Sequence, residues 1–311
     1  MITAKGLTRK YGEFTAVNDV SFTIPNGQVV GLLGHNGAGK TTIMKMLTGF
    51  IEPTSGTATI DGLDVVVDRL AVQEKVGYLP EVSPLYPELT VAEYLEYVAA
   101  LRGIPSQEVV GLIKEAVERT SLATKLTAQI STLSKGYKQR LGVAQAIMHN
   151  PDILVLDEPT SGLDPSQINE MRSLLRSLSS TSTVIISTHI LQEVEAMCDR
   201  VIIIYNGEVA ADANLEELRS MNCVIAEIDK NNDEVQRVYR SVEGVLDVRF
   251  LDWTDGRHRY EIKTRDNPLS IIPRLSYTAI SSGWQLFQIG QERRTLEAVF
   301  REINISAEET R

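Results

Sequence analysis

The sequence predicts an α/β fold for the first two thirds of the chain and a small α+β fold for the remainder. Apolar strand-like runs alternate with helical segments as far as residue 214, one run leads into a glycine-rich turn, and the order of elements changes after residue 215. The chain of 311 residues has room for two domains, because a domain takes roughly 150 residues. We therefore expect domains at residues 1–214 and 215–311.

The strands of the first part are β-branched, and several are apolar along their whole length, as expected for strands buried on both faces of a sheet. They are Val29–Leu33, Ile153–Leu156, Thr183–Ser187 and Val201–Tyr205. The helical segments are Thr41–Thr48, Val91–Arg102, Gln107–Thr120, Tyr137–His149 and Ser166–Leu178. Strands that alternate with helices in this way indicate a mainly parallel sheet.

The second part follows the order β-α-β-β-α-β, which is typical of the ferredoxin-like arrangement. Its expected strands are Cys223–Ile228, Leu246–Leu251, Arg259–Thr264 and Trp284–Ile289, and its expected helices are Asp233–Val242 and Leu269–Ser281. A last amphipathic segment, Thr295–Ile303, has apolar residues at helical spacing. Both tryptophans, Trp253 and Trp284, are expected to pack in the core of this part.

Composition and charge exclude several classes of protein. Hydrophobic residues make up 43% of the chain and charged residues 23%, which argues against a disordered chain. No apolar run approaches the ~18 residues that a membrane helix needs, and the first ten residues do not resemble a secretory signal. The net charge of −10 disfavours a basic surface for nucleic acid. The two cysteines have no metal-binding spacing and are expected to be free thiols.

The glycine-rich turn lies between the strand Val29–Leu33 and a helix, and it fits the phosphate-binding pattern G-x-x-x-x-G-K-[ST]. Glycines let the backbone turn tightly and point its N–H groups at phosphate oxygens, while the helix N-terminus adds partial positive charge. We expect Lys40 to reach the β- and γ-phosphates and the Thr41 hydroxyl to bind Mg²⁺. The residues expected to bind the nucleotide here are Gly34, Asn36, Gly37, Ala38, Gly39, Lys40, Thr41 and Thr42.

Two carboxylates, Asp157 and Glu158, end the apolar strand Ile153–Leu156. Ligands of open α/β sheets bind at the carboxyl ends of the strands. We expect Asp157 to hold Mg²⁺, usually through a water, and Glu158 to act as the general base for an attacking water. The alternative, a solvated acidic strand end, is disfavoured by the phosphate-binding pattern in the same chain.

Five further segments, in chain order, resemble those of the ATPase subunits of ABC transporters. They are Tyr11-Gly12, Leu79–Glu81, Leu133–Tyr137, Ser161–Asp164 and Ser187–His189. In that family they are the adenine-stacking loop, the Q-loop, the signature sequence, the D-loop and the switch histidine. The resemblance covers residues 2–214 almost continuously. It implies a P-loop ATPase core with a helical subdomain that binds ATP and Mg²⁺ and hydrolyses the ATP.

The resemblance also implies that two such subunits pair head to tail, with two ATP molecules between them. Ser134 and Gly136 would then cap the γ-phosphate bound by the other subunit, and Asp164 would lie at the seam. His189 would contact the γ-phosphate and support the general base, and Tyr11 would stack on the adenine. The catalytic residues implied are Lys40, Glu158 and His189.

Two positions depart from the commonest family pattern. Glu81 stands where glutamine is usual; a carboxylate can still bind Mg²⁺ but cannot donate as an amide does. Lys135 stands where the signature usually has glycine. We hypothesise that its positive charge adds to the group that caps the γ-phosphate.

With these departures, the sequence resembles a narrower group, the ATPases of export-type bacterial ABC transporters of the gliding-motility-like branch. The segments that carry this resemblance are Gly77–Glu81, Pro84–Pro87, Leu133–Arg140 and Thr295–Phe300. It implies an ATPase, expected as a homodimer, that powers a separate transmembrane permease at the cytoplasmic face of the cell membrane, and the acidic charge predicts that no nucleic acid is a partner. The permease would contact the surface near Glu81–Tyr86.

Other functions stay open. A soluble ABC-type ATPase that acts on ribosomes or DNA is disfavoured by the single set of motifs, the absence of sustained heptads and the acidic charge. A nucleotide-binding protein without turnover is disfavoured by the presence of Glu158 and His189. The second domain could stabilise the ATPase dimer, bind a regulatory ligand or partner, or simply cover the core.

Overall fold

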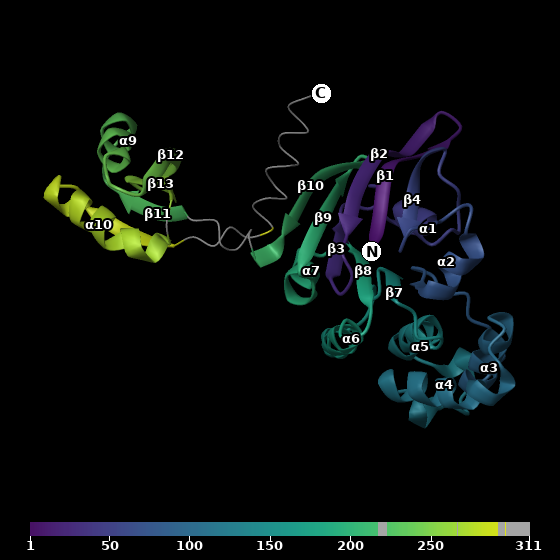
Figure 1. Cartoon of the computed structure of the whole chain (residues 1–311). Coiled ribbons are helices and arrows are strands. Elements are labelled where there is room, and N and C mark those ends of the chain that lie inside the picture. Colours follow the sequence, from purple (N-terminus) through teal and green to yellow (C-terminus); the bar gives the residue numbers. More distant parts are fainter. Residues whose placement is uncertain (217–222, 266, 292–295, 297–311) are drawn as a thin grey trace. The chain divides into compact units, whose positions relative to one another are not determined.

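The structure, a computed structural model, describes residues 1–216, 223–265, 267–291 and 296 (Figure 1). The chain divides into two compact units, Met1–Leu215 and Glu216–Arg311. The expected helix Thr295–Ile303 lies outside the described residues except for Leu296. Within the described part of the chain, no helix combines the length and the apolar character that crossing a bilayer requires.

A six-stranded sheet of order β10-β9-β3-β8-β7-β6 forms the centre of the first unit. Its strands are β3 (Val29–Leu33), β6 (Val76–Leu79), β7 (Ile153–Asp157), β8 (Thr183–Thr188), β9 (Arg200–Tyr205) and β10 (Glu208–Asn214). All neighbours are parallel except β9 and β10. The expected parallel sheet is therefore confirmed, and β3, β7 and β8 are buried along their whole length, as their apolar sequences require.

A second, antiparallel sheet of order β2-β1-β4-β5 packs against the same unit and was not expected from the sequence. Its strands are β1 (Ile2–Tyr11), β2 (Phe14–Ile24), β4 (Ser55–Ile60) and β5 (Leu63–Asp64). One core contains Leu7 of β1, Val30 of β3 and Ile43 of helix α1 (Lys40–Leu47), so the two sheets and the helix share an interior. Buried and exposed residues are mixed in β1 and β2, which makes these strands less obvious than fully apolar ones.

The remaining helices of the first unit cover the parallel sheet or form a helical subdomain. They are α2 (Arg69–Lys75), α3 (Val91–Leu101), α4 (Ser106–Arg119), α5 (Lys135–Ile147), α6 (Pro165–Leu178) and α7 (Leu191–Met197), with short 3₁₀ turns at Ala123–Lys125 and Ile130–Thr132. Helices α3, α4 and α5 lie together at one end of the unit (Figure 1) and share a core. A capping box fixes the start of α3: Thr90 Oγ1 accepts from the Glu93 N–H at 3.2 Å, and Glu93 Oε2 accepts from the Thr90 N–H at 2.8 Å.

The second unit has the expected ferredoxin-like order. Its elements are β11 (Cys223–Ile228), α9 (Asn232–Arg240), β12 (Val245–Thr254), β13 (Arg257–Thr264), α10 (Pro268–Ser281) and β14 (Leu286–Gln291), and the antiparallel sheet has the order β12-β13-β11-β14. Residues from both helices share one core with alternate residues of β11, so both helices cover the same face. Within that core the rings of Tyr239 and Trp284 meet edge to face, 5.4 Å apart.

The expectation that both tryptophans are buried is wrong for one of them. Trp284 is 4% exposed, whereas Trp253 is 60% exposed. Trp253 follows an irregularity in β12 between Phe250 and Asp252 and lies close to the end of the strand. It pairs with His258, the centres of the two tilted rings lie 6.4 Å apart, and Trp253 is not among the residues of the shared core.

Candidate nucleotide-binding and catalytic site

The phosphate loop, Gly34–Thr42, joins β3 to α1, and close packing leaves no room for a side chain at two of its glycines. Gly39 has φ +108° at the helix start, and a Cβ there would lie 2.7 Å from the Ala16 carbonyl oxygen. A Cβ on Gly34 would collide with the Ile204 carbonyl oxygen. The loop is therefore held between β2 and β9, and its backbone conformation is fixed by close packing.

Lys40, the first residue of α1, is buried and folds back over the loop. Its Nζ donates to the carbonyl oxygens of Gly34 at 2.8 Å and of His35 at 3.1 Å. It also lies 3.9 Å from Glu158 Oε1. Burial lowers the pKa of Lys40, and the nearby carboxylates of Glu158, Asp157 and Glu81 oppose that shift. The carboxylates expected at the site therefore gather around the ammonium of the loop.

Asp157, at the end of β7, is completely buried. The Ser187 hydroxyl of β8 donates a hydrogen bond to Asp157 Oδ1. The second oxygen, Oδ2, has no hydrogen-bond partner among the described residues. A buried carboxylate oxygen without a partner is costly, and it fits a site that receives a hard cation or a water bound to one.

Glu158 follows directly and has φ +48°, a left-handed conformation that is strained for this residue type. Its backbone N–H donates to Ser187 Oγ at 2.9 Å and to the Ser187 carbonyl oxygen at 3.2 Å. His189, after β8, places Nδ1 3.0 Å from both Glu158 carboxylate oxygens. The turn after β7 thus aims the carboxylate of Glu158 at the phosphate loop on one side and at His189 on the other.

A pocket of about 440 Å³ contains most of the residues expected at the site. Its lining residues are Tyr11, Phe14, Ala16, Asn36, Gly37, Gly39, Lys40, Thr41, Thr42, Glu81 and Glu158. Gly34 and Ala38 belong to the loop but do not line this pocket, and neither do Asp157 and His189.

Sequence reasoning missed three residues of the site. Phe14 pairs with Tyr11 across the β1–β2 turn and is 63% exposed, so the pocket has two aromatic rings at its edge. An aromatic residue three positions after Tyr11 was the available signal. Ser187 orients Asp157 and Glu158, a role that its place beside Thr188 and His189 in the sequence does not indicate. Buried Glu193 accepts from the Thr188 hydroxyl at 2.7 Å, one residue before His189.

Ser134, Gly136 and Asp164 lie outside this pocket. Ser134 caps α5, where its Oγ accepts from the Tyr137 N–H at 3.4 Å. Asp164 caps α6, where its Oδ1 accepts from the Gln167 N–H at 2.9 Å. This hydrogen bond is the main cause that lowers the pKa of Asp164. The chain itself therefore does not bring these residues to its own phosphate loop.

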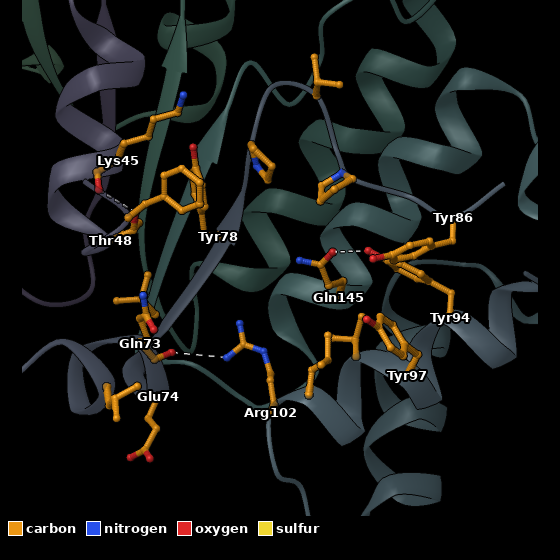
Figure 2. A pocket seen from close by; sticks show the side chains of 18 residues that line it. Lys45, Thr48, Gln73, Glu74, Tyr78, Tyr86, Tyr94, Tyr97, Arg102 and Gln145 are labelled. Atoms are coloured by element: carbon orange, nitrogen blue, oxygen red, sulfur yellow. Dashed lines mark hydrogen bonds between the residues drawn. The ribbon is translucent and has the colours of Figure 1, made fainter. Parts of the chain in front are cut away.

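A larger groove, of about 810 Å³, lies beside the Q-loop (Figure 2). Its lining residues are Lys45, Thr48, Phe50, Leu70, Gln73, Glu74, Val76, Tyr78, Pro80, Val82, Pro84, Tyr86, Tyr94, Tyr97, Val98, Leu101, Arg102 and Gln145. They come from α1, α2, β6 and the loop after it, α3 and α5, so the groove runs between the core and the helical subdomain. Tyr94 donates to Gln145 Oε1 at 2.6 Å across its floor (Figure 2).

The parallel sheet, the phosphate loop at the end of β3 and the carboxylates at the end of β7 define the class of protein as a P-loop ATPase. A family model described as "ABC transporter" matches residues 17–161. The chain belongs to the family of ABC transporter ATP-binding proteins. It is an ATP-binding and ATP-hydrolysing subunit of such a transporter.

The chain is similar to the bacitracin transport ATP-binding protein BcrA of Enterococcus faecalis, with 39% identity over 82% of each chain. It is also similar to the Nod factor export ATP-binding protein I of Burkholderia lata, with 38% identity over 73% of this chain and 76% of that one. Among solved structures it resembles the dimeric post-hydrolysis state of the ATP-binding cassette MJ0796 bound to ADP and Pi. That match has 26% identity and a TM-score of 0.63, and it covers 69% of this chain and 98% of the cassette.

Proposed function

We propose that two copies of this chain form a homodimer that powers a separate membrane permease, and that the transport is export. The family membership and the similarity to a Nod factor export protein support the direction. The chain would lie at the cytoplasmic face of the cell membrane, where ATP is available. Residues 1–214 would form the ATP-binding domain and residues 215–311 an accessory domain. The observation that carries the proposal is the groove beside the Q-loop, next to the nucleotide pocket.

The nucleotide would bind in the 440 Å³ pocket. The loop residues Gly34, Asn36, Gly37, Ala38, Gly39, Lys40, Thr41 and Thr42 would surround the phosphates with backbone N–H groups and the Lys40 ammonium. The exposed ring of Tyr11 would stack on the adenine, and the Arg9 guanidinium already lies 4.7 Å from the centre of that ring. One face of the ring is thus supported by the protein.

Mg²⁺ would be held by Thr41, Glu81 and Asp157, together with phosphate oxygens. No group of three or more His, Cys, Asp or Glu side chains in the described part of the chain could hold a metal ion by itself. The unpartnered Oδ2 of Asp157 is the observation that favours a cation or its water here. When bound, Mg²⁺ would neutralise charge that develops on the phosphates.

Hydrolysis would use Glu158 as the general base that accepts a proton from the attacking water. The carboxylate is nearly buried and 3.9 Å from Lys40 Nζ, so it would lie beside the γ-phosphate that this lysine binds. His189, in the tautomer with a proton on Nδ1, would donate to the Glu158 carboxylate and orient it. Its side chain is 44% exposed, which leaves the other ring nitrogen access to the γ-phosphate.

A second copy, placed head to tail, would complete each site. Ser134 and Gly136 lie at the N-terminus of α5, where backbone N–H groups and the helix dipole favour a phosphate. These residues and Asp164 lie outside the pocket of their own chain, so they are free to act on a nucleotide bound by the partner. The similar cassette MJ0796 is described as dimeric, which supports this arrangement.

The groove beside the Q-loop would take a segment of the permease. The stretch Pro80–Tyr86 contributes Pro80, Val82, Pro84 and Tyr86 to its wall, and Glu81 of the same stretch lines the nucleotide pocket. A partner pressed against this wall would therefore act on the segment that holds a residue of the ATP site. Aromatic and aliphatic side chains at the groove suit an apolar helix of the partner.

One pair of substitutions tests this function. Val82→Asp places a charge in the groove, where Val82 is 82% exposed, and Val110→Asp places the same charge on α4, where Val110 is 76% exposed outside the groove. Tagged protein from detergent-solubilised membranes should recover a multi-spanning membrane protein with Val110→Asp and lose it with Val82→Asp. Recovery of ribosomes or DNA, or equal recovery with both variants, would contradict the proposal.

The accessory domain would stabilise the dimer of ATPase domains. A chain that ends at residue 214 should then need a higher concentration than the full chain to form a dimer with ATP. Unaltered dimerisation would contradict this role and leave regulation by a ligand or partner as the alternative.

A further inference from the structure

Gln167 of α6 lies against Gly136 of the signature sequence in the same chain. Its amide atoms Cδ, Nε2 and Oε1 lie 2.8, 3.0 and 3.0 Å from the point that a Cβ on Gly136 would occupy. Three nearly equal distances mean that the amide lies flat on the glycine. Any side chain at position 136 would displace Gln167, because distances near 3 Å leave no room for a carbon atom.

The same glutamine also forms hydrogen bonds with Asp164, the last residue of the D-loop. The backbone N–H of Gln167 donates to Asp164 Oδ1 at 2.9 Å, and its side-chain Oε1 accepts from the Asp164 backbone N–H at 3.4 Å, which makes a capping box at the start of α6. One side-chain amide therefore joins the capping residue of the D-loop to the glycine of the signature.

Two further contacts hold the same two helix ends together. The Lys135 side chain packs on Gly162 of the D-loop, with Cε 3.0 Å and Cδ 3.4 Å from the point that a Cβ on Gly162 would occupy. Gly162 has φ +68°, a conformation that favours glycine. One turn further along α5, Arg140 forms an ion pair with Glu170 of α6. The first two turns of α5 thus contact the D-loop once, through Lys135, and the first two turns of α6 twice, through Gly136 and Arg140.

We propose that Gln167 is a positioning residue that fastens the signature to the D-loop of its own chain, so that both approach the partner's nucleotide as one rigid body. The inference rests on the head-to-tail dimer of the proposed function. Gln167 itself lies outside the nucleotide pocket of its own chain. Its effect is on geometry: a small misplacement of a phosphate-capping group lowers the rate of the chemical step.

A double-mutant cycle of Gln167→Ala and Gly136→Ala in the full chain tests the proposal. Gln167→Ala should lower kcat on the order of tenfold, because the cap loses its alignment. The affinity of the single chain for a fluorescent ATP analogue should not change, since the phosphate loop is elsewhere. The double variant should be no slower than the slower single variant, because both substitutions break one contact. Gln167→Glu should retain most of kcat, since glutamate also closes a capping box.

Asn169→Ala is the matched control, since Asn169 is exposed on the same helix two residues further on; it should leave kcat unchanged. If the two reductions in kcat multiply in the double variant, or if Gln167→Ala has a normal kcat, the inference is overturned, although the head-to-tail dimer is not. Wild-type turnover per chain that does not rise with protein concentration would overturn the dimer and the inference together.

Discussion

His189 Nδ1 lies 3.0 Å from both carboxylate oxygens of Glu158. The two residues come from different strands of the parallel sheet, because Glu158 follows β7 and His189 follows β8. Strands β7 and β8 are adjacent and parallel, and Asp157 is paired with Ser187. This register brings Glu158 and His189 together. A histidine equidistant from both oxygens restricts the rotation of the carboxylate, and this is the role expected of a group that orients a general base.

We predict that Glu158→Gln lowers ATP turnover on the order of 10²- to 10⁴-fold, the usual contribution of a general base. ATP binding should persist, because the amide is isosteric and the phosphate loop is unchanged. Phosphate release and binding of a fluorescent ATP analogue measure the two properties separately. His189→Ala should also lower ATP turnover, although Glu158 is intact. Normal turnover in either variant would contradict the roles of Glu158 as general base and of His189 as the residue that orients it.

The unpartnered oxygen of Asp157 predicts a specific metal defect. Asp157→Asn should raise the Mg²⁺ concentration for half-maximal turnover at least on the order of tenfold, since an amide is a weaker partner for a cation or its water. Asp152→Asn is the matched control, because Asp152 precedes the same strand and pairs with Lys75 at the surface. Equal Mg²⁺ requirements for the two variants would count against the metal role, and excess chelator should stop wild-type turnover.

The two glycines of the phosphate loop with positive φ should respond differently to alanine. At Gly39, φ is +108° and the new Cβ would lie 2.7 Å from a carbonyl oxygen, whereas at Gly37, φ is +82° and no atom lies within 4 Å. Gly37→Ala should therefore cost about 1 kcal/mol of unfolding free energy, and Gly39→Ala about 2–4 kcal/mol. Thermal unfolding without nucleotide compares the two variants, and equal losses of stability would show that the loop is not packed tightly against β2 at Gly39.

Acid should destabilise the protein through His149. Burial, assisted by Arg102 and opposed by a hydrogen bond to the Val76 carbonyl, lowers the pKa of His149 from 6.5 to about 4. Between pH 6.5 and pH 4 the unfolded chain binds a proton there that the folded chain does not, so stability falls as the pH falls. The loss attributable to His149 should reach about 2 kcal/mol after allowance for its partial exposure. His149→Gln, which keeps a donor for Val76, should show a smaller loss in denaturant titrations at pH 7 and pH 4.5.

Much of the fold could be predicted because its signals are local. The strand Val29–Leu33 and the turn after it match the structure residue for residue, since a fully buried strand is apolar throughout and a phosphate loop needs glycine. The antiparallel sheet of β1, β2, β4 and β5 was missed because its strands mix buried and exposed residues. The prediction that Trp253 is buried is wrong because this residue lies near the end of β12, where it pairs with His258 beyond the residues of the shared core, and composition does not show how far a core extends along a strand.

The candidate site was predictable in its residues and less so in its contacts. Tyr11, Glu81 and Glu158 are far apart in sequence, yet they line one pocket with the phosphate loop. The sequence assigns no contact to Ser187 within the segment Ser187–His189 and none to Gln167, so only the folded structure shows their hydrogen bonds to Glu158 and Asp164. Likewise, only the folded structure shows that Ser134 and Asp164 lie outside the nucleotide pocket of the same chain.

In the proposed mechanism, ATP brings two copies of this chain together and so completes each site. Sedimentation velocity of the Glu158→Gln protein in Mg²⁺ with ATP, and then with ADP, tests it most directly. Because this variant binds ATP without consuming it, we predict a dimer with ATP and a monomer with ADP. A variant that stays monomeric with ATP, while the wild type still releases phosphate at a rate per chain that is independent of its concentration, would show that a single chain hydrolyses ATP without a partner.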